Sequence, residues 1–482
     1  MRFEFSRHEL ALAAVAALGA TAMSTAPGTA SAAKTAGTYA TGDFHNHTTC
    51  SDGSISMQKL VKKATDKVDT PWGLDWFVQA GHGGNGNRNC TLVEDASLAT
   101  PAYPQVFSTS NAPQGPTTTW QNTNPPVQPK GLVSGSAPSQ VMWRWQSIQE
   151  FQYPLVEYLS LYKNKPMFVG VESVVAGHEH SSMSVITGQM PNTLDSAVLP
   201  TTPGYSALGN ATALSQWEYC FDRADTDTSR GNTAVGSGSG NNWDCSVAGS
   251  LNAGDPSWNA TAQKLMPTGS TGVGDRGHQK TVEAIKWMAQ NHPTGSYYVP
   301  AHLERAGPFN PDGNNGYNIE HLRNFNNAGP KVSFGFETQP GHAASSDRGE
   351  YAVNRNTING KKVDSVGGTT YGGTGVYGAQ IGGVWDALLG EGRNWWFFAS
   401  SDWHNRGIFG PDDRRSSQDF FPGEYQRTAV MVRNGGDPKL RPQTIVDGLR
   451  TGNAFAASGQ LIDRLAFVAC ASYPGPASRR SS

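Results

Sequence analysis

Short apolar runs recur along this 482-residue chain, and several of them stop at a side chain that can bind a metal ion. The runs contain β-branched and aromatic residues, which is typical of buried strands. We therefore expect each of these side chains to stand at the end of a strand. The runs and the side chains that follow them are residues 42–44 before His45 and His47, 76–78 before His82, 167–171 before Glu172, 297–299 before His302, 332–336 before Glu337, and 395–399 before Asp402 and His404.

Helical patterns alternate with these runs. Their apolar residues follow the i, i+3, i+4, i+7 spacing of one helix face, Ser56 is a candidate N-cap, and Pro154 should kink the helix that contains it. Repeated strand–helix units favour an α/β protein with a parallel sheet, either open or closed into a barrel. We expect the helices over residues 57–64, 141–162, 282–289 and 319–325.

The first residues have the pattern of an export signal. Arg2 and Arg7 are basic, residues 10–20 are apolar, and Ala30-Ser31-Ala32 is a small-x-small cleavage site. The apolar run has about eleven residues, fewer than the roughly 20 that span a bilayer. We expect a signal peptide over residues 1–32 and a mature protein that is secreted, or held in the periplasm or cell envelope, without a membrane span.

The rest of the chain is expected to form one domain. It would cover residues 33–465, with polar, Pro-rich insertions at about 100–138 and 193–271, and a disordered tail would follow at 466–482. The formal net charge is only −2, and charged residues make up 16% of the chain, so no basic surface is predicted for a nucleic acid or an anionic membrane. These values favour a small-molecule partner; the oligomeric state stays open.

Five cysteines in an exported chain allow disulfides, and none has the spacing of a thiolate metal site. Cys220 and Cys245 flank a Gly/Ser/Asn-rich stretch and form the best candidate pair. Cys50 with Cys90 is the next candidate, which would leave Cys470 unpaired.

Two dyads share the same spacing. In His45-Asn46-His47 and Asp402-Trp403-His404, residues i and i+2 point to one face of a strand, so both side chains can bind one ion. The dyads come from the first and last predicted strands, which are neighbours in a closed barrel. Glu172 ends a strand between them, and its carboxylate could bridge two ions about 3.5 to 4 Å apart.

The remaining histidines divide into two groups. His82 and His302 stand at strand ends. In Gly177-His178-Glu179-His180 one histidine should face the site, and we favour His180 because an apolar run resumes just after it. Three further histidines fall on helical patterns and are expected to be surface residues, and His342 stays open; the three are His278, His292 and His321.

These motifs resemble the PHP (polymerase and histidinol phosphatase) superfamily of metal-dependent phosphoesterases. The similar segments are His45-Asn46-His47 with Ser51-Asp52-Gly53, then Gly170-Val171-Glu172, then Ser401-Asp402-Trp403-His404, and the segment from Gly448 to Phe455 is similar to one that follows the barrel in secreted relatives of carbamate hydrolases.

The resemblance implies a distorted (βα)7 TIM-like barrel with long loop insertions and two or three divalent metal ions, which would be Zn, Mn or Fe. It also implies the ligands. One ion would take His45, His47, Glu172 and Asp402, a second Glu172, His180 and His302, and a third Asp52, His82 and His404.

The implied reaction is hydrolysis of a phosphoester by a hydroxide that bridges two ions. Glu172 and Asp402 would be catalytic as ligands, and Arg305 and Arg406 are candidate clamps for an oxyanion. A carboxylic or carbamic ester is an alternative substrate, and a non-catalytic exported protein that binds metal or glycan is an alternative function. A calcineurin-like phosphoesterase is disfavoured because no GNH[DE] motif occurs, and an amidohydrolase because Glu172 stands where that family usually has a carboxylated lysine.

Overall fold

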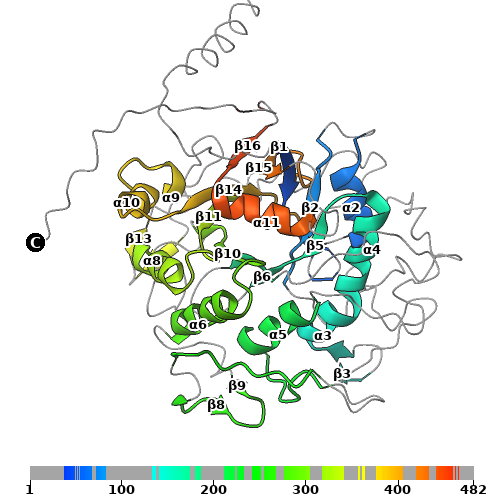
Figure 1. The fold of residues 1–482 in the computed structure, drawn as a ribbon, viewed down its shortest axis with the longest axis vertical. Helices are drawn as coiled ribbons and strands as arrows, with labels where there is room; N and C mark the ends of the chain where they lie inside the picture. Colours follow the sequence, from blue (N-terminus) through cyan, green and yellow to red (C-terminus); the bar gives the residue numbers. More distant parts are fainter. Residues whose placement is uncertain are drawn as a thin grey trace, which may run out of the picture. The chain divides into compact units, whose positions relative to one another are not determined.

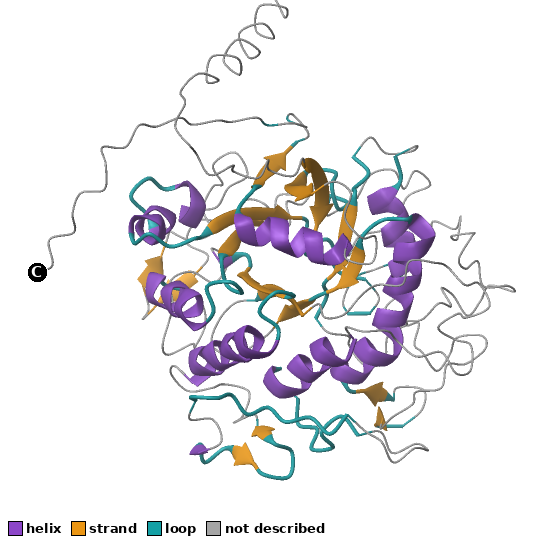
Figure 2. Ribbon diagram, viewed as in Figure 1, coloured by secondary structure: helices purple, strands orange, loops and turns teal. Residues whose placement is uncertain are grey.

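Half of the described strands form two sheets, and the other half form strand pairs (Figures 1 and 2). The strands are β1 (Gly37–Asp43), β2 (Trp76–Gln79), β3 (Val133–Ser134), β4 (Val141–Met142), β5 (Met167–Val169), β6 (Val171–Ser173), β7 (Ser181–Val185), β8 (Trp258–Asn259), β9 (Lys264–Leu265), β10 (Ser296–Pro300), β11 (Gly335–Pro340), β12 (Asn356–Ile358), β13 (Lys361–Val363), β14 (Trp396–Ser400), β15 (Gln426–Arg433) and β16 (Ala454–Ser458).

The computed structural model describes residues that all belong to one compact unit beginning at Gly37. The predicted signal peptide and tail, and most of the insertion at 100–138, lie outside them, so the domain division stays a prediction. The described residues are 37–48, 50, 51, 53, 55–67, 72–82, 133–136, 140–173, 180–185, 211–222, 225–232, 241–250, 254–266, 276–303, 317–340, 356–358, 361–363, 376–404, 420–433, 441–459, 462 and 465.

The larger sheet has the order β16-β15-β1-β2-β5. Strands β1, β2 and β5 are parallel, whereas β15 pairs antiparallel with both β1 and β16. The second sheet, β10-β7-β6, is antiparallel throughout. A separate pair, β11 and β14, is parallel.

The predicted (βα)7 barrel is therefore wrong. Among the described residues the ladders form several separate sheets, and no ladder closes into a ring. One physical reason lies between β6 and β7, where only residues 174–180 connect the strands. A parallel crossover needs about a dozen residues or more, so this short connection gives an antiparallel pair. Strand β15, which the apolar runs did not indicate, adds an antiparallel neighbour to β1.

Helices lie around the strands (Figure 2). They are α2 (Met57–Thr65), α3 (Arg144–Ser147), the π-helical turn η1 (Ile148–Gln152), α4 (Tyr153–Lys163), α5 (Ala211–Phe221), α6 (Arg276–Asn291), α8 (Ile319–Ala328), α9 (Val376–Ala379), α10 (Val384–Gly390) and α11 (Arg441–Thr451).

The predicted helices at 57–64, 282–289 and 319–325 are confirmed as α2, α6 and α8. The Ser56 side chain caps α2 by accepting a hydrogen bond from the Lys59 backbone N–H, as expected for an N-cap serine. The helix predicted at 141–162 differs, because its first two residues form β4 and its middle is the π-helical turn η1. Pro154 is the second residue of α4, just after this turn, and a proline has no N–H for the regular helical hydrogen bond.

The predicted insertion at 193–271 contains helix α5, whose residues pack into the core. The side chains of Leu214 and Trp217 are fully buried in the larger apolar cluster. The predicted disulfide between Cys220 and Cys245 is confirmed and ties α5 to the segment before β8. Cys50 is also disulfide-bonded, and its expected partner Cys90 lies outside the described residues.

A second apolar cluster lies between strands of different sheets. Trp76, Phe168, Val299 and Phe398 come from β2, β5, β10 and β14 and are all buried in it, and residues of α11 pack against them. This cluster lets strands of separate sheets pack side by side without a continuous ladder. Their carboxyl ends are thereby brought to one region.

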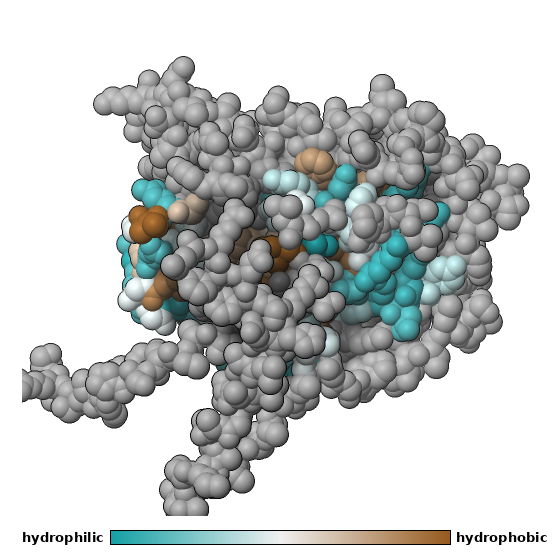
Figure 3. All heavy atoms as spheres, turned by 90° about the horizontal axis from the view of Figure 1, so that it is seen from above, coloured by the Kyte–Doolittle hydropathy of each residue, from teal (hydrophilic) through white to brown (hydrophobic). Residues whose placement is uncertain are grey.

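The described surface on the face in Figure 3 is largely hydrophilic, with separate apolar spots. Ile381, at 94% exposure, is the most exposed large apolar residue of the described chain. None of the helices in the described ranges combines the length and the apolar character needed to cross a membrane.

Candidate metal centre

Backbone hydrogen bonds join the ends of strands from different sheets. Asp402 N donates to His45 O at 2.8 Å, and His47 N donates to Trp403 O at 2.8 Å. A third backbone hydrogen bond runs from Glu172 N to Gly81 O at 2.9 Å. These bonds hold the two i, i+2 dyads against each other although they lie near opposite ends of the chain.

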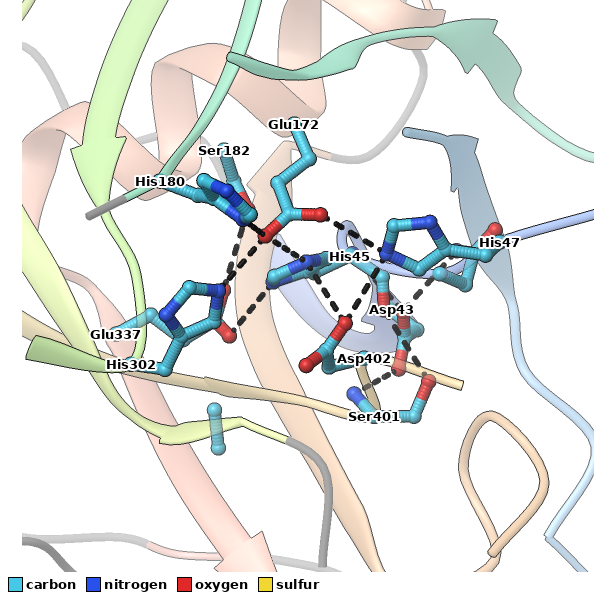
Figure 4. Close-up of polar contacts among 12 residues, drawn as sticks. Asp43, His45, His47, Glu172, His180, Ser182, His302, Glu337, Ser401 and Asp402 are labelled. Atoms are coloured by element: carbon cyan, nitrogen blue, oxygen red, sulfur yellow. Dashed lines mark hydrogen bonds and ion pairs between the residues drawn. The ribbon is translucent and has the colours of Figure 1, made fainter. Parts of the chain in front are cut away.

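The carboxylate of Glu172 lies at the centre of the histidines (Figure 4). It is buried, and every ion-pair partner that it has among the described residues is an imidazole. Oε1 lies 2.5 Å from His180 Nδ1, 2.7 Å from His302 Nε2 and 3.3 Å from His45 Nε2, and Oε2 lies 3.0 Å from His47 Nε2 and 3.3 Å from His82 Nε2.

Asp402 is the second carboxylate of the cluster. Its Oδ1 lies 3.1 Å from His45 Nε2 and 3.0 Å from His47 Nε2. His404 completes the dyad: its ring stacks on that of His47, with centroids 3.7 Å apart. Both predicted dyads therefore face one region together with Glu172.

Three groups of these residues could hold a cation, because their ligand atoms lie within 4.8 Å of one another. The first is the predicted set around Asp402. The second joins His82 to Glu172 and His180, and the third has His47 where Asp52 was predicted. The groups are His45, His47, Glu172 and Asp402, then His82, Glu172 and His180, and then His47, His82 and His404.

The remaining predicted residues are His302, which belongs to none of these three groups, and residues of segments that the structure does not describe. His302 contacts Glu172 directly, on the same oxygen as His180. Asp52, Arg305 and Arg406 lie outside the described residues, as does His178, the alternative to His180.

The donor set fits a divalent cation on a further observation. His45 Nε2 and Glu172 Oε2 are buried and make no well-aligned hydrogen bond to a described residue, although Asp402 Oδ1 lies 3.1 Å from the first and His47 Nε2 lies 3.0 Å from the second. A buried polar atom with poorly met hydrogen bonding costs free energy, which a metal ion would recover. Imidazole and carboxylate ligands of this kind accept Zn, Mn and Fe alike.

A hydrogen bond selects the tautomer of His404. His404 Nδ1 lies 2.7 Å from the backbone carbonyl of Asp402, which can only accept, so Nδ1 carries the proton. The other nitrogen of that ring, Nε2, keeps its lone pair for an ion. His45 Nδ1 lies 2.9 Å from Glu337 Oε1.

Charge coupling within the cluster shifts its pKa values. Burial favours the neutral acid of Glu172, yet the imidazoles of His180, His82 and His45 hold the pKa of Glu172 well below its usual value. Burial likewise favours neutral His45, but Glu337, Asp402 and Glu172 raise the pKa of His45 well above its usual value. The site favours positive charge next to its carboxylates.

Two of the site residues have strained backbones. His302 has φ of 35° and Asp402 has φ of 46°, in the left-handed region that non-glycine residues rarely adopt. Such conformations persist where the surroundings over-determine them, often at functional sites. Here they turn two side chains into the cluster just after β10 and β14.

Two buried carboxylates were missing from the predicted site. Glu337 was noted only as the end of a strand, and Asp43 only as part of one. Asp43 accepts hydrogen bonds from His45 N at 3.0 Å, Asn46 Nδ2 at 3.1 Å and Ser401 N at 2.7 Å. Burial raises the pKa of Asp43 to about 6 despite these donors. Spacing alone could not reveal either role, because the contacts Glu337–His45 and Asp43–Ser401 join residues that are far apart in the sequence.

The expectation that His278 and His321 are surface residues is wrong. Both are buried, and their rings lie 4.4 Å apart where α6 packs against α8. They take no part in the cluster around Glu172.

Compared with known proteins, the chain matches no family model, no curated protein and no solved structure.

Proposed function

We propose that this chain is an exported, metal-dependent hydrolase that cleaves a phosphoester with two or three divalent cations. The observation that carries the proposal is the buried carboxylate of Glu172, which meets imidazoles on both of its oxygens. A carboxylate placed in this way suits a bridge between two ions.

Shared ligands limit how many ions the cluster could hold at once. His47 and His82 each belong to two of the three groups, and a neutral imidazole has one lone pair to give. We propose one ion at His45, His47, Glu172 and Asp402. For a second ion the resemblance implies Glu172, His180 and His302, whereas the ligand-atom distances group Glu172 and His180 with His82. A third ion at His82 and His404 would need a further ligand, for which Asp52 is the candidate.

The chain's own residues would place and orient the ligands of the cations. Glu172 and Asp402 hold negative charge where the cations belong, and the Asp402 carbonyl keeps His404 in a ligating tautomer. Bound divalent cations would supply an acidified water as nucleophile and stabilise charge on the non-bridging oxygens of the ester.

The positive φ of His302 and Asp402 supports a functional site, either catalytic or ligand-binding, and we propose the catalytic role from the resemblance of the motifs to the PHP superfamily. A phosphoester is favoured over a carboxylic or carbamic ester by the order of the motifs, which resembles the PHP superfamily. Arg305 and Arg406 are proposed to clamp the phosphoryl oxygens.

A substrate panel tests the proposal. Metal-free protein is reconstituted with Zn²⁺, Mn²⁺ or Fe²⁺ and assayed on p-nitrophenyl phosphate, bis-p-nitrophenyl phosphate and p-nitrophenyl acetate, with an aryl carbamate as the fourth ester. Turnover of a phosphoester that requires added metal is the expected result. Turnover of the acetate or carbamate alone would show that the enzyme is a carboxylic or carbamic ester hydrolase. Full metal loading without any turnover would refute catalysis.

Export is tested separately. Expression with the complete N-terminus should give a mature protein outside the cytoplasm that begins near Ala33, as read by N-terminal sequencing. A cell-retained protein that still begins at residue 1 or 2 would contradict the proposed signal peptide.

A further inference from the structure

The buried carboxylate of Glu337 lies behind the metal centre, on the side of His45 away from Glu172. Its exposed fraction is 0%. Oε1 lies 2.9 Å from His45 Nδ1, and Oε2 accepts a hydrogen bond from Ser182 Oγ at 3.3 Å. Both oxygens are therefore engaged by side chains of other strands (Figure 4).

The backbone holds Glu337 firmly in this position. Glu337 forms an isolated parallel β-bridge with Ala301 on one side and pairs with Phe398 of β14 on the other. The register of the β11–β14 pair shifts between Glu337 and Gln339, which marks a bulge. Bulges re-aim side chains next to functional sites.

His45 faces carboxylates at both ring nitrogens, so either nitrogen could carry the single proton of the neutral ring. Its Nε2 lies 3.3 Å from Glu172 Oε1 and 3.1 Å from Asp402 Oδ1. A neutral imidazole carries a single N–H, which must point either to Glu337 or to the Glu172 side. Only in the first tautomer is the Nε2 lone pair available to an ion.

We propose that Glu337 is a positioning residue of this metal centre, which holds the His45 N–H on Nδ1 and thereby turns the Nε2 lone pair toward Glu172 and Asp402. This inference rests on the proposed metal-dependent function. A carboxylate behind a ligating histidine also increases the basicity of the ligand, and loss of such partners typically weakens metal binding about 10- to 100-fold.

The experiment compares substitutions at Glu337 with a matched control. Glu337→Gln keeps the shape and an oxygen that can accept from Nδ1, whereas Glu337→Ala removes the acceptor. Ser182→Ala removes only the contact at the far oxygen. Glu218→Gln makes the same chemical change at a buried glutamate of α5, whose described ion-pair partner is Arg144.

Each variant is freed of metal and titrated with Zn²⁺ against a chromophoric chelator, and the absorption bands of Co²⁺ are recorded. Glu337→Ala should weaken the binding of one ion about 100-fold and shift the Co²⁺ bands. Glu337→Gln should recover part of this loss, Ser182→Ala should change affinity only a few-fold, and Glu218→Gln should bind as the wild type does.

Wild-type affinity and unchanged Co²⁺ bands in Glu337→Ala would overturn the proposal. If Glu337→Ala fails to fold, Glu337→Gln decides in its place: weaker binding of one ion with unshifted melting of the metal-free protein supports the inference, and wild-type binding refutes it. A wild-type protein that binds no metal would instead refute the proposed function itself, so the two failures are distinguishable.

Discussion

The imidazole ring of His404 stacks on that of His47, with ring centroids 3.7 Å apart and an interplanar angle of 18°. The two histidines belong to dyads near opposite ends of the chain. The backbone bond from His47 N to Trp403 O, at 2.8 Å, fixes their register. This contact brings the two dyads into one site with Glu172, and the first predictions concern that site.

Replacing Glu172 by Gln should reduce hydrolytic activity by orders of magnitude while the fold is kept. The amide cannot carry the charge that meets imidazoles on both oxygens, so at least one ion should be lost. Activity of the metal-loaded variant and its metal content by mass spectrometry check this expectation. A near-normal rate would show that Glu172 does not bridge ions.

Replacing His278 by Ala should leave activity and bound metal unchanged. This histidine packs against His321 and Phe325 and hydrogen-bonds Asn324, away from the cluster around Glu172. Because the ring is buried, the free energy of unfolding should fall by about 1–3 kcal/mol. Loss of metal in this variant would contradict the ligand assignment.

Removing metal with a chelator should lower the melting temperature as well as the activity. Ions that bind only the folded state stabilise it, by about 2.7 kcal/mol when free metal is at 100 times its dissociation constant. Thermal melts of metal-free protein across a Zn²⁺ or Mn²⁺ titration measure the effect. Melts that do not respond to either ion would argue against a metal centre.

Acid should destabilise the protein through His321. Burial and the neighbouring His278 lower the pKa of His321 to about 3, from 6.5 for an ordinary histidine. Between these values the unfolded chain binds the proton and the folded chain does not, so stability falls as the pH is lowered from 6.5 toward 3. The expected slope from this group approaches about 1.4 kcal/mol per pH unit.

The variant His321→Gln isolates this contribution. The backbone N–H of Asn318 donates to His321 Nδ1 in the capping box of α8, and glutamine fills the same position in many capping boxes. Urea unfolding at pH 7, 6 and 5 should show a shallower loss of stability in the variant. Identical slopes in the two proteins would exclude His321 as the source.

Replacing Asp43 by Asn should destabilise the protein by about 1–3 kcal/mol, because one donor that now bonds a carboxylate oxygen would face an amide NH2. Asp75→Asn, at a partly exposed carboxylate that accepts from Thr41 N, is the control and should cost less. Urea unfolding at neutral pH measures both. Equal losses of unfolding free energy in the two variants would mean that the hydrogen bonds of Asp43 to His45 and Ser401 do not stabilise the protein more than an exposed contact does.

The candidate site could largely be predicted because its residues follow strands. Spacing placed His45 with His47 and Asp402 with His404, and the strand-end rule found Glu172, His82 and His302. The structure brings these side chains within contact distance of one another. The choice of His180 over His178 depended on the apolar run that follows, and His180 does contact Glu172.

The arrangement of the strands could not be predicted from the same patterns. Apolar runs show that a strand is buried but carry no information on its direction or neighbour. The antiparallel pairing of β6 with β7 and of β1 with β15 therefore escaped prediction, and the expected barrel was wrong. The buried positions of His278 and His321 escaped for the same reason, since they depend on how α6 packs against α8.

The sequence by itself determined which side chains could bind metal, three of the helices (α2, α6 and α8), and that Cys220 pairs with Cys245, because these follow from residue type and local spacing. Only the tertiary structure decided that Glu337 hydrogen-bonds His45 and that Asp43 joins the ends of β1 and β14. Contacts of that kind join residues hundreds of positions apart. They arise only when separate strands pack, and local patterns do not encode that packing.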